Sequence, residues 1–297
     1  MAIATSEISR KIADLDNIPT VPALLVPLLR RLGEPAENVN VTEIVTLISY
    51  DKSLTAQCLH MANSPLLGMR NRVETVQGAV MALGMTKVRE VATTCCLLRA
   101  LPARPGSLKP TDLWKHSLAC ALVSREFARR VGYADPEQAY LAGLLHDLGL
   151  IVELTTFPKE FEAVTRVAIE KRCPIHEAEP AVLGVDHCVI GEMLAERWHL
   201  PLELKEVIRH HHDVEHASVA PVLVSIVNLT DILCRMRGLG YGFDELRQVD
   251  LSAEYGWRHI GEGLPAMRNF DLARFTLELD TYIEEIERLV TTLFNMA

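Results

Sequence analysis

The sequence lacks any apolar run close to the length of a membrane span, and aromatic residues make up only 5% of its 297 positions. A helix needs about 20 consecutive apolar residues to cross a bilayer. The first ten residues (MAIATSEISR) also lack the basic flank and apolar core of a signal peptide. We therefore expect a cytoplasmic protein with no membrane partner.

The chain also lacks a basic surplus and any CxxC pair. Lysine and arginine number 30 against 39 for aspartate and glutamate, which gives a formal net charge of −9. Without excess cations to release phosphate counterions, we expect no nucleic-acid partner. The cysteine count of seven is odd, and the cysteines are scattered through apolar segments. They indicate reduced, buried thiols rather than a disulfide framework or a zinc finger.

Apolar residues recur at helical spacing along the chain, whereas the alternation typical of strands is almost absent. With hydrophobic residues at 49% and few aromatics, this pattern predicts an all-α, multi-helix bundle packed by aliphatic side chains. The helices are expected at 21–32, 42–48, 54–63, 76–83, 87–98, 112–131, 136–152, 158–172, 186–198, 202–212, 219–237 and 270–294, with a short one after Ser252.

Three prolines and a glycine fall within residues 101–110, which we interpret as a linker. It divides an N-terminal helical half at 12–100 from a second half at 111–237. A C-terminal extension at 238–297 begins with a glycine-rich break and ends in the last helix. The apolar residues of that helix follow a spacing close to a heptad. This allows either a homodimer contact or packing on its own domain, and so short a seam favours the second.

Histidines and aspartates recur after the linker in apolar surroundings. His146 and Asp147 lie within the segment LAGLLHDLGL, and Asp231 lies in another apolar helix. Burying such groups is costly unless they are satisfied. Imidazoles and carboxylates from several helices can converge on one or two divalent cations, and a bridging aspartate would hold two about 3.5–4 Å apart. Such ligands suit Fe, Mn, Zn or Ni better than Mg. From spacing alone, a hydrogen-bonded core is an equal alternative.

Four further segments carry a family resemblance. Residues 18–22 (IPTVP), 48–55 (ISYDKSLT), 59–64 (LHMANS) and 79–84 (AVMALG) are similar to motifs of the HDOD family. This family is the HD-related output domain of bacterial signalling proteins and resembles the HD superfamily of metal-dependent phosphohydrolases. The resemblance covers residues 12–237 and implies an HDOD domain of helices with an HD-like second half.

The resemblance also implies a set of metal ligands. The first histidine, the histidine–aspartate doublet and the later aspartate of the HD superfamily correspond to His116, His146, Asp147 and Asp231. The branch of that superfamily that hydrolyses cyclic di-GMP has three further histidines, which correspond to His187, His211 and His212. All seven residues are therefore predicted to bind one or two divalent metal ions.

Two departures from the family pattern weigh against hydrolysis. Leu150 stands where many HD hydrolases have a lysine that binds substrate phosphate, and no Gly-Tyr-Pro follows the histidine run. The second departure disfavours a cyclic di-GMP phosphodiesterase. Arg125, Arg129 and Arg209 are candidates to replace the lysine. We expect a signal-transduction module that acts through signalling proteins and retains a metal. The alternative is a metal-dependent phosphohydrolase of a nucleotide or other phosphoester, so enzymatic activity stays open.

Overall fold

The computed structural model describes residues 41–49, 52–63, 71–84, 88, 91–95, 110–241 and 249–295. Within these ranges the secondary structure is helical and includes no strand, which confirms the all-α prediction. The helix expected at 21–32, the motif at 18–22 and all but the last residue of the linker lie outside the described residues. The domain boundaries at 12, 100 and 237 stay predictions.

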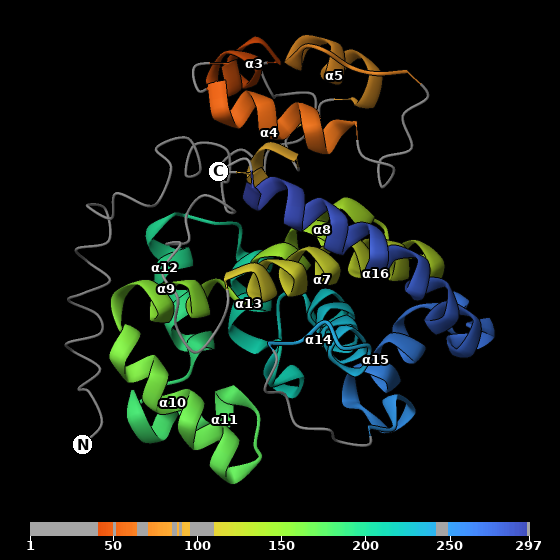
Figure 1. Cartoon of the computed structure of the whole chain (residues 1–297). Coiled ribbons are helices and arrows are strands. Elements are labelled where there is room, and N and C mark those ends of the chain that lie inside the picture. The colour runs from red at the N-terminus through yellow and green to blue at the C-terminus, as the bar shows by residue number, and fades with distance from the viewer. Residues whose placement is uncertain are drawn as a thin grey trace.

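Three helices of the N-terminal half pack together at one end of the molecule, at the top of Figure 1. They are α3 (Val41–Ser49), α4 (Lys52–Ala62) and α5 (Val76–Leu83). Just after α4, the side-chain amide of Asn63 donates to the carbonyl of Val73 and accepts from its N–H at 2.8 and 2.7 Å. These bonds tie the end of α4 to the segment that leads into α5. The asparagine of the ANS motif therefore has a structural role.

The second half is a bundle centred on α7 (Pro110–Val131) and α8 (Pro136–Leu145), which pack along each other. Helix α14 (Pro221–Met236) packs against both, and α13 (Leu202–His210) contacts α8 and α14. Helix α9 (Leu148–Thr156) packs on α12 (His187–Arg197), and α10 (Pro158–Lys171) packs on α11 (Ile175–Val182) beside them. The core of the bundle therefore lies where α7, α8, α9, α12, α13 and α14 meet.

The last two helices cover the bundle from one side. Helix α15 (Tyr255–Gly263) packs on α14, and α16 (Leu272–Asn295) packs on α7 and reaches α4. On α16, Phe275, Leu279 and Ile286 are buried. This helix therefore packs its apolar face against its own chain, which was one of the two expected alternatives. A homodimer contact through it stays a prediction.

One predicted helix is wrong in a way that affects the site. The helix expected at 136–152 is two helices, because α8 ends at Leu145 and α9 begins at Leu148. Asp147, with φ −93° and ψ 24°, leaves the helical conformation and precedes α9. Apolar residues continue at helical spacing on both sides of the break, so the periodicity concealed it. Helix α11 was also not predicted.

No single helix among the described residues is long and apolar enough to cross a membrane. One bent pair of segments, Pro136–Thr156 and Pro158–Lys171, has the length and apolar composition of a membrane span only when its two parts are taken together, and the angle between them is 119°.

Candidate metal centre

Three glycines let the helices of the bundle approach until their backbones touch. A methyl group at Gly143 of α8 would lie 2.6 Å from the carbonyl oxygen of Cys120 on α7. A methyl group at Gly149 of α9 would lie 1.9 Å from the carbonyl oxygen of His187 on α12, and one at Gly191 would lie 2.6 Å from Ile208 on α13. Real side chains do not pack this closely, so these crossings require glycine. They bring the polar residues of five elements to one point.

Asp147 lies at that point, and its two carboxylate oxygens face different imidazoles. Oδ2 is 3.5 Å from His116 Nε2 and 3.0 Å from His146 Nε2. Oδ1 is 3.3 Å from His187 Nε2 and 3.5 Å from His211 Nε2. A carboxylate that presents one oxygen to each of two ligand groups has the arrangement of a bridge between two cations. Four histidines from four parts of the sequence therefore converge on one aspartate.

The same four histidines hold their other ring nitrogen, Nδ1, against a hydrogen-bond acceptor. Nδ1 of His116 is 2.6 Å from the Leu239 carbonyl, and Nδ1 of His146 is 2.7 Å from the Gly143 carbonyl. His187 Nδ1 is 2.9 Å from both oxygens of Glu179, and His211 Nδ1 is 3.1 Å from the carbonyl of Ile208. Because these oxygens only accept, Nδ1 donates in each case. In the neutral rings the lone pair of Nε2 then points toward Asp147, which suits metal binding.

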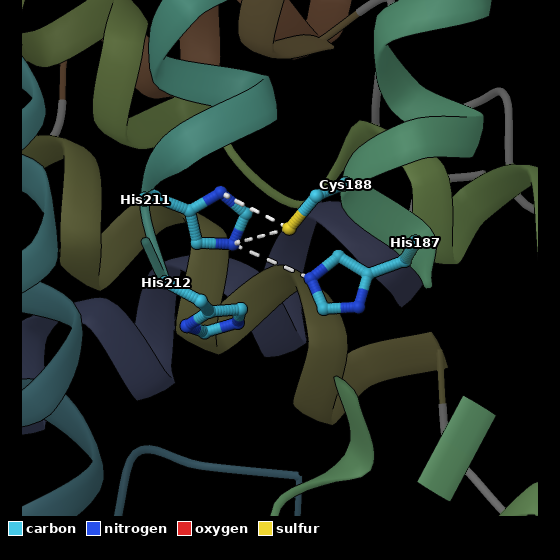
Figure 2. A group of neighbouring side chains, drawn as sticks. All are labelled: His187, Cys188, His211 and His212. Carbon is cyan, nitrogen blue, oxygen red and sulfur yellow. Dashed lines mark hydrogen bonds between the residues drawn. The ribbon is translucent and has the colours of Figure 1, made fainter. Parts of the chain in front are cut away.

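Asp231 and His212 complete the predicted set. Asp231 Oδ1 lies 3.1 Å from His116 Nε2, so it joins the group on the Oδ2 side of Asp147. The centroid of the His212 ring is 4.1 Å from that of His211 and 3.9 Å from that of His176, on which it stacks. Figure 2 shows His212 beside His187 and His211. Those two histidines are the ones that face Asp147 Oδ1. The structure therefore brings all seven predicted residues together.

We call these two groups position 1 and position 2, with Asp147 shared between them. Position 1 consists of His116, His146, Asp147 and Asp231. Position 2 consists of Asp147, His187, His211 and His212. Apart from the half-buried His212, each of these residues is at most 3% exposed. Charged and polar groups so deeply buried must neutralise one another or bind a cation.

The buried carboxylates and imidazoles of the centre shift one another's pKa values. Burial opposes the charged form of His116, but the hydrogen bond and charge of Asp231 outweigh it and raise the pKa to about 9. Burial likewise opposes protonation of His211, and Cys188 and Asp147 raise its pKa to about 10. Burial alone would raise the pKa of Asp147, yet the neighbouring imidazoles, His146 first, hold it well below its usual range. The carboxylate is therefore ionised and attracts cations.

The distances and the donors fit a transition-metal ion. His187 Nε2, His211 Nε2 and Asp147 Oδ1 form a triangle with edges of 3.3, 3.3 and 3.5 Å. Ligands at about 2.0–2.1 Å in a tetrahedral site would be about 3.3–3.4 Å apart. In position 1, His146 Nε2 is buried and makes no hydrogen bond, although a carboxylate oxygen is close. A cation between this nitrogen and the carboxylate would satisfy both.

Among the residues at the centre that were not identified from the sequence, three contact its predicted ligands through charged or hydroxyl groups. Arg235 forms an ion pair with Asp231, and Tyr241 donates a hydrogen bond from its hydroxyl to Asp147 Oδ2. Glu179 of α11 holds His187. The spacing of four between Asp231 and Arg235 on one helix was a usable signal. Tyr241 and Glu179 gave no such signal, because their partners are far away in the sequence.

The lysine position is filled by a core residue, and the proposed replacement cations form ion pairs of their own. Leu150 is 0% exposed and packs in the apolar core. Arg125 and Arg129 form ion pairs with Glu137 at 3.7 and 2.8 Å, and Arg209 pairs with Glu192 at 3.2 Å. These arginines therefore have acidic partners other than the site residues.

Comparisons with known proteins agree with this architecture. The sequence matches the HDOD domain family over residues 18–214. A Treponema pallidum protein is 30% identical over 215 residues, which are 72% of this chain but only 41% of that relative. An HDOD domain protein of unknown function from Geobacter sulfurreducens has a solved structure with a TM-score of 0.82 and 31% identity, covering 98% of this chain and 99% of its own.

A third similarity concerns the fold alone. The solved structure of a candidate signal transduction protein from Marinobacter aquaeolei has a TM-score of 0.73 at 23% identity, covering 98% of this chain and 64% of its own. The chain thus spans less than two thirds of the length of the Treponema and Marinobacter proteins.

Proposed function

The chain belongs to the HDOD family, and from that premise we propose that it is a regulatory module that binds a divalent metal at the Asp147 centre and acts through signalling-protein partners. The metal would be Fe, Mn, Zn or Ni rather than Mg, because imidazole is the main ligand. The observation that carries the proposal is the placement of the two Asp147 oxygens, each facing its own pair of imidazole Nε2 atoms.

The position of the centre in the fold supports a regulatory role. Its ligands come from α7, the turn between α8 and α9, α12, the end of α13, and α14. A bound cation would neutralise the buried carboxylates and connect these elements. Since such binding contributes directly to folding free energy, metal occupancy would set how firmly the helices hold together. A partner protein that contacts the bundle could respond to that change.

The chain's own residues prepare the centre for a cation. Glu179 and three backbone carbonyls hold the histidine rings with Nε2 directed at Asp147. Arg235 offsets the charge of Asp231, and the Tyr241 hydroxyl donates to Asp147. Burial of these groups excludes bulk water from the ligand atoms. These features support a structural or sensory metal, and Leu150 in the core supports the same interpretation.

A second candidate function is metal-dependent hydrolysis of a nucleotide or other phosphoester. The specific observation in its favour is again the bridging arrangement of Asp147, because two metals held about 3.5–4 Å apart can activate water for attack on phosphorus. Arg235, which is 16% exposed, is the cation at the site that could contact a phosphate oxygen. Phosphoester hydrolysis is expected for this candidate and not for the regulatory module, so an activity assay distinguishes the two.

Elemental analysis of the purified protein tests the metal proposal. We expect one or two equivalents of transition metal in the wild type and a loss of metal in Asp147→Asn. Asp213→Asn is a matched control, because Asp213 is exposed and pairs with His216 outside the centre. Equal metal content in all three proteins, or none in the wild type after reconstitution, would overturn the proposal.

A phosphodiesterase assay separates the two functions. Metal-loaded wild type is incubated with bis(p-nitrophenyl) phosphate, beside Asp147→Asn. The regulatory proposal expects no turnover above the variant. Turnover that the variant lacks would replace it with the phosphohydrolase.

A further inference from the structure

A thiol lies within position 2, where neither the family motif nor the ligand prediction includes one. Cys188 follows His187 in the first turn of α12 and is 2% exposed. Its Sγ lies 3.9 Å from both ring nitrogens of His211. Figure 2 shows the sulfur directed toward the His211 ring, with dashed lines to both of its nitrogens. One potential ligand atom from each of these four residues lies within 4.8 Å of all the others.

We propose that Cys188 is a thiolate ligand of position 2 and makes that position selective for Zn²⁺ or Fe²⁺ over Mg²⁺ and Mn²⁺. This inference rests on the proposed metal site. Coordination forms a bond from Sγ to the metal and releases the thiol proton to solvent. A soft thiolate beside imidazoles favours borderline or soft cations, whereas hard cations prefer oxygen.

The distances need little adjustment for this bond. With a metal–sulfur bond of about 2.3 Å and a metal–nitrogen bond of about 2.0–2.1 Å, tetrahedral ligands would be about 3.6 Å apart. Cys188 would take the fourth tetrahedral place, beside His187, His211 and Asp147 and in place of the half-buried His212. The observed separation of 3.9 Å between Cys188 Sγ and His211 Nε2 is slightly longer. The first turn of α12 is held by two bonds, from His187 N to Glu179 at 2.7 Å and from Val189 N to Asp186 at 2.9 Å. The helix therefore holds Cys188 in place before a metal binds.

The charge of the two positions explains why the inference concerns Cys188 and not Cys120. Cys120 Sγ lies 3.5 Å from His116 Nε2 in position 1, where Asp147 and Asp231 already supply two carboxylates. A thiolate there would be a third anion in a buried site. Position 2 has only the shared oxygen of Asp147 as an anion. A thiolate there would give position 2 one anion of its own beside the shared carboxylate, as Asp231 does in position 1.

Cobalt substitution reports thiolate ligation without any assay of activity. Co²⁺ is titrated into metal-free, full-length protein, and bound cobalt is counted by elemental analysis. We expect a thiolate-to-cobalt charge-transfer absorption in the near ultraviolet for the wild type. Cys188→Ser should still bind cobalt in position 1 but lose this absorption. Cys173→Ser, which removes a thiol outside the centre, should keep it, and so should Cys120→Ser.

Two results would overturn the inference while leaving the metal site intact. One is cobalt binding without the charge-transfer absorption, and the other is an absorption that survives in Cys188→Ser. Failure of the folded wild type to bind any cobalt or zinc would instead overturn the metal proposal itself. X-ray absorption of the zinc-loaded wild type needs no variant: a sulfur shell at about 2.3 Å supports the inference, and a shell of nitrogen and oxygen alone contradicts it.

Selectivity supplies an independent measurement. Loss of the sulfur should weaken zinc binding by more than about tenfold, since even losing a supporting residue costs that much. The affinity for Mn²⁺ should change much less in the same variant. Equal losses for both metals would contradict a role of Cys188 in selectivity.

Discussion

Gly149 of α9 and His187 of α12 are in backbone contact, since a methyl group on Gly149 would lie 1.9 Å from the His187 carbonyl oxygen. Asp147 lies two residues before Gly149, and its Oδ1 is 3.3 Å from His187 Nε2. The crossing of these two helices therefore sets the distance between two predicted metal ligands. A glycine in the HDLGL segment has a packing role that also determines the geometry of the centre.

Gly149→Ala should destabilise the protein by about 3 kcal/mol or more, because α9 and α12 must move apart to admit the methyl group. Metal content should fall in the same variant. Urea denaturation and elemental analysis measure the two effects. Gly191→Ala should also destabilise the protein, because a methyl group there would lie 2.6 Å from Cγ2 of the buried, β-branched Ile208 and 3.1 Å from the backbone nitrogen of Gly149.

Gly261→Ala is the control for this comparison. Gly261 lies on α15, and a methyl group there meets nothing within 4 Å. The free energy of unfolding of this variant should be unchanged or raised by up to about 1 kcal/mol, since alanine favours helix more than glycine does. Similar urea midpoints for Gly149→Ala and Gly261→Ala would contradict the role of the close crossing.

The helices were largely predictable from apolar spacing. The expected helix at 76–83 has the observed bounds of α5, and the one at 158–172 differs from α10 by one residue. The break at His146 and Asp147 was not predictable, because Leu144, Leu145 and Leu148 continue the helical pattern across it. Backbone direction at that turn depends on packing against other helices, which periodicity within one segment does not report.

The site was predictable only in part. The family resemblance implied the four histidines that converge on Asp147, but neither it nor the residue pattern could indicate which atoms face each other. Tyr241 and Asp147 are 94 positions apart, so only the folded bundle shows their hydrogen bond. Cys188 was interpreted from its apolar surroundings as a buried thiol, which is correct, yet its place beside His211 depends on how α12 and α13 pack.

The metal content of variants at Asp147 and Asp231 should distinguish the two metal positions. Asp147 faces both positions, whereas Asp231 contacts His116 in position 1. In protein that binds two metal ions, Asp231→Asn should lose one equivalent, and Asp147→Asn should lose most of both. Elemental analysis after reconstitution and buffer exchange gives the counts. Identical losses in the two variants would contradict a bridging role for Asp147.

Glu179→Gln should weaken metal binding by about 10–100-fold, the usual effect of losing a partner that orients a ligand histidine. Glu179 accepts from His187 Nδ1 and from the His187 backbone N–H at 2.9 and 2.7 Å. Competition with a chromophoric chelator measures the affinity. Glu177→Gln, an exposed change on the same helix, should leave it unaltered. Equal affinity in the two variants would indicate that His187 does not bind the metal.

Glu206 should contribute stability that depends on pH. Burial alone would raise the pKa of this carboxylate, but hydrogen bonds from the N–H groups of Val219, Ala220 and Ser218 outweigh burial and lower it from 4.5. Its stabilisation is therefore present above pH 4.5 and is lost as the pH falls through the lower folded-state pKa. These bonds hold the start of α14, the helix of Asp231.

Thermal melts from pH 7 to pH 3 test this role. Glu206→Gln should be less stable than wild type at pH 7 by about 2 kcal/mol, the scale of hydrogen bonds to a charged group. The difference should shrink as the pH falls below 4.5. Glu215→Gln, an exposed change nearby, should follow the wild type throughout. A difference between Glu206→Gln and wild type that stays constant down to pH 3 would contradict the mechanism.

Leu150→Lys distinguishes a core position from a vacant phosphate-binding position. Leu150 is 0% exposed, so a lysine there would bury an ammonium group without a partner and destabilise the protein by about 4 kcal/mol. Leu150→Met keeps the volume and should cost less than about 1.5 kcal/mol. Urea denaturation compares the two variants, and the phosphodiester assay is run on whichever folds. A folded Leu150→Lys protein with new, metal-dependent turnover would show that the lysine reaches a substrate beside Asp147. In that case the wild-type chain would have a hydrolase site that lacks only the lysine ammonium group. Leu150 would then no longer be an argument for the regulatory proposal.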